Sequence, residues 1–133
     1  MNAAFIMRLQ KHVERLAAQH EINLDTSWAK GVNQAHVSRA RDRVHIPPIT
    51  TLIRYAVALH EIGHVLGRYQ DHYNEVVTER WAWEWARCNA IWWTPEMERF
   101  AEQALRGYQR EREHRRIIWK VRPSQLARSR ERG

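Results

Sequence analysis

HEIGHVLGRYQDHYNEVVTERWAWEWA, residues 60–86, is the stretch that decides how this chain folds and what it can bind. Its first five residues place two histidines four positions apart. Because an α-helix turns once every 3.6 residues, His60 and His64 project from the same face of a helix. Their neutral imidazole nitrogens can then bind one metal ion. The spacing therefore predicts a divalent metal site, and we expect the ion to be zinc, Zn²⁺.

Glu61 directly follows the first histidine and lies about 100° further around the helix. This places its carboxylate where a zinc-bound water would lie, which is the position of a general base. The surrounding segment, AVALHEIGHVLG, is otherwise apolar. Burying histidine and glutamate there is costly unless their polar groups are satisfied, which favours a metal site over a chance pattern. We expect Glu61 to be the catalytic residue that activates the water.

Several side chains that follow the histidine pair could be the third metal ligand. A pattern with a ligand six residues after His64 fails, because that position holds Gln70, a poor zinc ligand. The other pattern takes a glutamate from the next helix. On a helical projection Glu79 shares its face with Ala82 and Ala86, small residues that let two helices approach closely. The remaining candidates are Glu84, Glu75, His72 and Asp71.

The segments HEIGHVLG and ERWAWEWA together resemble the HExxH and ExxAxxFA motifs of the ImmA/IrrE family of metallopeptidases. In the second motif Glu79, Ala82 and Ala86 match, and Trp85 occupies the aromatic position. The sequence VHIPP, just before the metal-binding helix, is similar to the edge strand of that family. The resemblance covers about residues 32–95.

This resemblance implies a gluzincin-like metallopeptidase with a minimal zincin fold, from a family associated with phages, other mobile elements and stress regulation. It implies zinc held by His60, His64 and Glu79, and hydrolysis of a peptide bond in a protein or peptide substrate. The chain differs from the family in its tryptophan-rich third helix and its basic C-terminal end.

Hydrophobic patterning predicts an α+β fold that is mostly helical, with a short antiparallel β-ribbon before the HExxH helix. Apolar residues alternate with polar ones on both sides of a turn within residues 31–48, which indicates the ribbon. We expect residues 44–46 to form an exposed edge that aligns an extended substrate by strand addition. Helices are expected over residues 1–19, 50 to 67 or 69, and 74–92, and from Thr94 towards Trp119.

A chain of 133 residues is long enough for one domain, which we place at residues 1–122, followed by a basic flexible tail over residues 123–133. The single cysteine excludes a disulfide framework and a thiolate zinc cluster, and favours a reducing compartment such as the cytoplasm. Charged residues interrupt the N-terminal amphipathic segment, unlike a signal peptide. No uncharged apolar run reaches about 18 residues, so we expect no membrane span.

The net charge of +7 is concentrated at the C-terminal end. Residues 106–133 contain 10 Lys or Arg and 3 Asp or Glu, whereas residues 1–105 contain 12 of each. This excess is typical of a solvated helix end, and it also allows weak nucleic-acid contact. The basic end also suggests an alternative function. The protein would be a non-enzymatic, zinc-stabilised module that binds a protein or nucleic-acid partner through this basic end and the tryptophan-rich helix.

Overall fold

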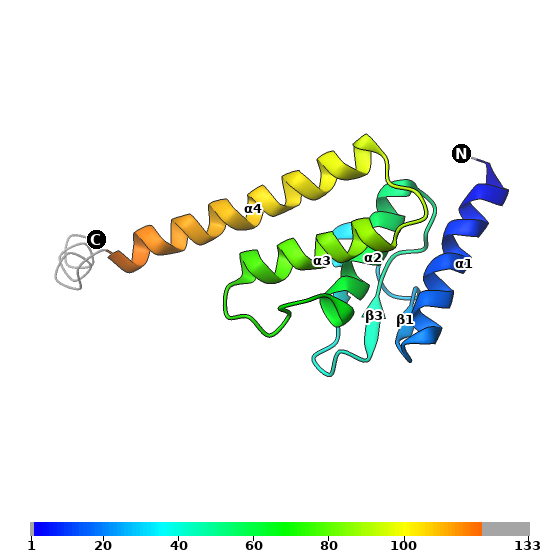
Figure 1. Ribbon diagram of the computed structural model, residues 1–133, viewed down its shortest axis with the longest axis horizontal. Helices are drawn as coiled ribbons and strands as arrows, with labels where there is room; N and C mark the ends of the chain where they lie inside the picture. Colours follow the sequence, from blue (N-terminus) through cyan, green and yellow to red (C-terminus); the bar gives the residue numbers. More distant parts are fainter. Residues whose placement is uncertain (1, 121–133) are drawn as a thin grey trace.

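The computed structural model describes the backbone of residues 2–120 and the side chains of residues 2–115. It has an α+β fold that is mostly helical, as the hydrophobic patterning predicts (Figure 1). The elements, in chain order, are α1 (Ala3–Gln19), β1 (Asn23–Asp25), a short 3₁₀ turn η1 (Val32–Gln34), β2 (His36–Val37), β3 (Arg43–His45), α2 (Leu52–Leu66), α3 (Glu75–Asn89) and α4 (Pro95–Lys120). The basic segment 123–133 lies outside the described residues.

The three strands form one mixed sheet in the order β1-β3-β2. The antiparallel ribbon is present as β2 and β3, with Val37 opposite Val44. In addition, β1 pairs in parallel with β3, and Leu24 also lies opposite Val44. The expectation that residues 44–46 form an exposed edge is therefore wrong, because β3 is the central strand and Val44 is fully buried. The free edge on the α2 side is β2.

Side-chain caps explain where three of the helices begin. The Asn2 side chain accepts a hydrogen bond from the backbone N–H of Phe5 at the start of α1. Thr51 caps α2 in the same way. The hydroxyl of Thr94 accepts from the N–H of Met97, and Pro95 occupies the first position of α4, where no backbone donor is required.

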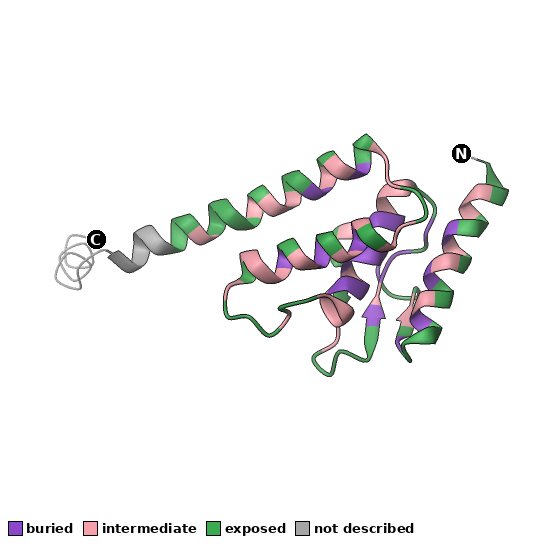
Figure 2. Cartoon of the chain, in the orientation of Figure 1, coloured by how far each residue is buried: buried purple, intermediate pink, exposed green. Residues whose placement is uncertain are grey.

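The central helix of the molecule is α2, which contacts α1, α3, α4 and β2. Figure 2 shows buried residues concentrated in α2 and along one side of α1 and of α3. The core joins Leu9 and Val13 of α1 to Leu59 of α2, and Met97 and Ala101 of α4 complete it. Helix α4 lies along α3 and extends beyond the other helices and strands (Figure 1). Within residues 2–120, no helix has both the length and the apolar character that a membrane span requires.

Candidate metal centre

Helices α2 and α3 bring His60, His64 and Glu79 together in the interior of the protein. The Nε2 atom of His60 lies 2.8 Å from Glu79 Oε2, and the Nε2 atom of His64 lies 3.1 Å from Glu79 Oε1. One ligand atom from each residue falls within 4.8 Å of the others. His60 and Glu79 are each 7% exposed. The structure thus places a carboxylate of α3 beside the histidine pair, as the helical projection predicts.

The geometry of these three side chains fits a divalent metal ion. The two histidine Nε2 atoms are 3.1 Å apart. Two imidazole nitrogens bound tetrahedrally to one zinc ion at about 2.05 Å are separated by about 3.3 Å. Glu79 Oε2 is buried and has no hydrogen-bond partner among the described residues, although it lies 2.8 Å from His60 Nε2. These atoms therefore point towards a shared position rather than directly at one another.

Gln70 determines which nitrogen of His64 faces this position. Its amide nitrogen donates to the backbone carbonyls of Thr78, at 2.9 Å, and of Arg68, at 3.2 Å. The amide oxygen must then face His64 Nδ1, from which it lies 2.9 Å. Nδ1 is therefore the protonated nitrogen, and Nε2 faces the centre, where its deprotonated form can bind a metal.

Close packing of α2 and α3 sets the distance between the histidines and the glutamate. A Cβ added at Gly63 would lie 2.5 Å from the carbonyl oxygen of Ala82. Ala82 and Ala86 are fully buried, so the small-residue face of α3 does lie against α2. Trp83 stacks on the ring of His60, with centroids 4.0 Å apart and an interplanar angle of 25°. The helices can approach this closely only because Gly63 has no side chain.

The electrostatics of the cluster keep Glu79 ionised. Burial raises the pKa of Glu79, but the close imidazole groups of His60 and His64 and their charges outweigh this effect and bring the pKa to about 2. Burial alone would lower the pKa of His64, but hydrogen bonding to Glu79 and the Glu79 charge raise it. Glu79 is therefore a carboxylate at neutral pH, the form in which it can hold a cation.

Glu61, the expected general base, lies on α2 directly beside this cluster. It is partly exposed, unlike the fully buried Ile62 that follows it. Burial raises the pKa of Glu61, while electrostatic interaction with His60 and His64 opposes that change. His36 of the edge strand β2 is also close enough to lower the pKa of Glu61. The carboxylate is therefore near both the candidate metal centre and the edge strand β2.

Tyr108, on α4, is a residue of this site that sequence reasoning missed. Burial raises the pKa of its hydroxyl, and the charge of Glu79 and a hydrogen bond to that carboxylate raise it further. Glu61 adds a smaller effect of the same sign. The hydroxyl therefore stays protonated and is able to donate to Glu79. Its position 29 residues beyond Glu79 left no local sequence signal.

The other candidate ligands lie on the surface and make contacts of their own. The side chains of Asp71 and Glu75 are 93% and 59% exposed, and each forms an ion pair with an arginine. Glu84 is also exposed and ion-paired. His72 accepts a hydrogen bond from a backbone N–H through Nδ1. The respective partners are Arg41, Arg115, Arg87 and Asn74.

Comparison of the chain with family models, with curated proteins and with solved structures gives no match. The interpretation of the site therefore depends on the residues and geometry of this chain.

Proposed function

We propose that this protein is a zinc-dependent metallopeptidase that hydrolyses a peptide bond in a protein or peptide substrate. The observation that carries the proposal is the convergence of His60, His64 and Glu79, with Glu61 next to the first of them. Among the described residues this group offers three metal ligands. Catalytic zinc sites have three protein ligands and keep a further position open, whereas structural sites are closed by four.

The roles of the residues follow from their positions. When bound, a zinc ion supplies a Lewis acid that polarises the substrate carbonyl and lowers the pKa of water to about 7. Glu61 accepts the proton of the attacking water and delivers it to the leaving amine. Because burial raises the pKa of Glu61, the carboxylate is a stronger base than an exposed glutamate. Gln70 and Tyr108 orient His64 and Glu79, respectively.

Strand β2, rather than β3, is suited to align the substrate. The N–H of Ser38 donates to the carbonyl of Arg43, so this pair is hydrogen-bonded across the ribbon. In an antiparallel ladder such pairs alternate, and the N–H and C=O of Val37 therefore face the open edge. An extended peptide can add to this edge and pass beside Glu61. The proposed fold is accordingly a minimal zincin of the ImmA/IrrE type, acting in the cytoplasm and associated with phages or mobile elements.

Two variants test the proposal by separating the base from the metal ligand. We expect the parent protein, supplied with zinc, to hold about one ion per chain by elemental analysis. Glu61→Gln should keep the ion but lose cleavage of a synthetic peptide mixture by at least about 100-fold, because an amide cannot accept the proton. Glu79→Ala should lose zinc affinity itself, whereas Glu84→Ala should not. Full activity of the Glu61→Gln protein, or unchanged zinc affinity of the Glu79→Ala protein, would contradict the proposal.

The alternative of a non-enzymatic, zinc-stabilised binding module has one observation in its favour. Helix α4 carries the basic residues of its C-terminal half away from the other elements (Figure 1). The tryptophan-rich helix supports it less, because Trp83 is 3% exposed and Trp85 packs against the core. Zinc X-ray absorption distinguishes the two functions. Four protein ligands would favour the module, and three with a water oxygen would favour the peptidase.

A further inference from the structure

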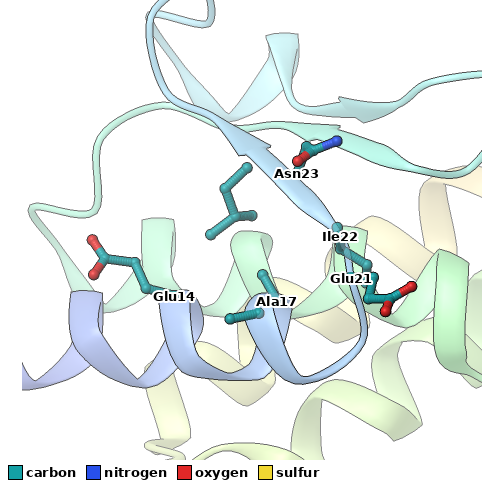
Figure 3. Close-up of a pocket in the computed structure, with 7 residues that line it drawn as sticks. Glu14, Ala17, Glu21, Ile22 and Asn23 are labelled. Carbon is teal, nitrogen blue, oxygen red and sulfur yellow. The ribbon is translucent and has the colours of Figure 1, made fainter.

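A polar pocket of about 240 Å³ adjoins His64 at the end of the edge strand. The end of β2 and the turn after it form one side, through Val37, Ser38, Arg39 and Arg41. His64 and Gln70 form part of the other side. The pocket therefore begins at a proposed metal ligand and continues along the strand that we expect to align a substrate. By contrast, a larger pocket of about 440 Å³ between α1 and β1 (Figure 3) includes none of the metal-centre residues.

Most polar side chains around the pocket at His64 are already paired within the protein. The hydroxyl of Ser38 donates to the carboxylate of Asp42, at 3.0 Å. Arg41 forms an ion pair with Asp71, at 2.9 Å, so its positive charge is balanced. Gln70 uses its oxygen for His64 and its nitrogen for backbone carbonyls, as described above.

Arg39 is the exception among the residues that line the pocket. Its guanidinium has no hydrogen bond or ion pair with any described residue. It is exposed, and it follows the edge strand by two residues.

An arginine without an ion-pair partner at the rim of a polar pocket attracts an anion, and its planar guanidinium matches the two oxygens of a carboxylate. A lysine or arginine of a substrate would be repelled there. An apolar side chain would gain little, because Val37 is the one apolar residue that lines the pocket.

We propose that this pocket binds a carboxylate group of the substrate close to the bond that is cut, and that Arg39 is the specificity-determining residue. The carboxylate comes from an aspartate or glutamate side chain, or from the C-terminus of the substrate. A peptide that adds to β2 at Val37 continues towards Arg39, because both belong to the same stretch of chain. The inference rests on the proposed peptidase function and specifies the substrates of that same site.

Cleavage profiling tests the inference with the full-length, zinc-loaded protein. Two mixtures of synthetic peptides are used, one with amidated C-termini and one with free C-termini but no aspartate or glutamate. Mass spectrometry identifies the residues on either side of each cut. A preference for aspartate or glutamate at one position near the cut in the amidated mixture identifies a side-chain carboxylate. Preferential cutting near the free C-terminus in the second mixture identifies the terminal carboxylate.

Substitutions of Arg39 then show whether this residue is responsible. Arg39→Ala should reduce the preference about fivefold, the effect of about 1 kcal/mol that a partly solvated ion pair provides. Arg39→Glu should favour lysine or arginine at the same position. Arg8→Ala removes the same charge from the exposed surface of α1 and should leave the preference unchanged. A binding measurement with the Glu61→Gln protein, comparing a glutamate peptide with its glutamine analogue, should give the same ratio without any cleavage.

The outcomes separate this inference from the function on which it rests. Cleavage without any preference for a carboxylate, or a preference that survives Arg39→Ala, overturns the inference and leaves the peptidase function intact. The absence of both cleavage by the parent and peptide binding by the Glu61→Gln protein overturns both.

Discussion

The side chain of Gln70 determines which tautomer His64 adopts, so we expect a substitution of Gln70 to change the affinity for zinc. Without it, Nδ1 of His64 loses its fixed acceptor and the ring is free to turn. Removing a hydrogen-bond partner of a histidine ligand typically lowers the metal affinity by about 10- to 100-fold. We therefore expect Gln70→Ala to weaken zinc binding by about that factor, measured by competition with a chromophoric chelator.

The neighbouring Asp71 supplies the control for Gln70. Its side chain is 93% exposed and is paired with Arg41, so Asp71→Asn should leave zinc affinity unchanged. Equal losses in the two variants would show that the loop as a whole, rather than the Gln70 hydrogen bond, supports the site. A loss of zinc affinity in Asp71→Asn alone would indicate that Asp71 is a metal ligand, one of the alternatives that the sequence allows.

Comparison of Glu79 with Gln70 shows what a sequence can predict about individual residues. Glu79 was identifiable because Ala82 and Ala86 repeat on its helix face, and this periodicity reports which side of α3 is buried. The role of Gln70 depends on a turn in which Tyr69 has a φ of 59°, a conformation that neighbouring residues do not encode for tyrosine. Sequence reasoning could therefore reject Gln70 as a ligand but could not find its actual contact.

At the scale of elements, the approach of α2 to α3 depends on Gly63. Because an added Cβ would lie 2.5 Å from the backbone oxygen of Ala82, Gly63→Ala must move one helix away from the other. We expect this variant to lose about 1–3 kcal/mol in the free energy of unfolding, measured in urea, together with zinc affinity. The second loss follows because His60 and Glu79 lie on the two helices that separate.

Gly107 on α4 is the matched control for Gly63. An added Cβ there meets nothing within 4 Å. Gly107→Ala should therefore increase the free energy of unfolding, by up to about 1 kcal/mol, because alanine has the higher helix propensity. Equal destabilisation by the two substitutions would show that the close contact of α2 with α3 is unimportant.

Tyr55 of α2 links α1 to the loop between α3 and α4 and gives a pH-dependent prediction. Burial raises its pKa to about 12, so the hydroxyl donates to His12 Nδ1, at 2.7 Å, and accepts from the N–H of Ile91, at 3.0 Å. Burial, followed by the charge of Arg15, lowers the pKa of His12. A lowered folded-state pKa means that the stabilisation is present above the unfolded value of about 6.5 and is lost as pH falls through the folded value.

Urea unfolding of the parent and of His12→Gln at pH 8 and at pH 5 checks this prediction. The parent should be the more stable protein at pH 8, and its advantage should shrink at pH 5. Because both proteins share their other titratable groups, the difference between them isolates His12. An advantage that is equal at the two pH values, or larger at pH 5, would show that His12 is not held neutral by its surroundings.

The sheet shows where prediction of elements from sequence reaches its limit. The ribbon of β2 and β3 was predictable because apolar residues alternate on both sides of its turn. Strand β1 has only three residues, Asn-Leu-Asp, too few for an alternating pattern. Its parallel pairing with β3 depends on the return of the chain after α1, and this pairing changes β3 from an edge strand to the central one.

Across the molecule as a whole, the excess positive charge of α4 is separated from the candidate metal centre. Helix α4 extends beyond the other elements, and residues 106–115 on it are largely exposed (Figure 2). Arg115 is paired with Glu75, whereas the exposed Arg106 and Arg110 have no ion pair with a described residue. If this basic end binds nucleic acid, the contacts are made to phosphates, which carry no sequence information directly.

We expect a titration with labelled DNA to show weak binding that depends strongly on salt. Each phosphate neutralised on duplex DNA contributes about −0.9 to the slope of log affinity against log salt concentration. Residues 123–133 contain 3 arginines, so removing them should make the slope shallower by at most about 2.7. Zinc content and Glu61-dependent cleavage should remain unchanged, because the proposed metal ligands lie on α2 and α3. Affinity should also be nearly equal for unrelated DNA sequences. Absence of binding at low salt, or affinity unaffected by the truncation, would instead assign the positive charge of this segment to solvation of the helix end.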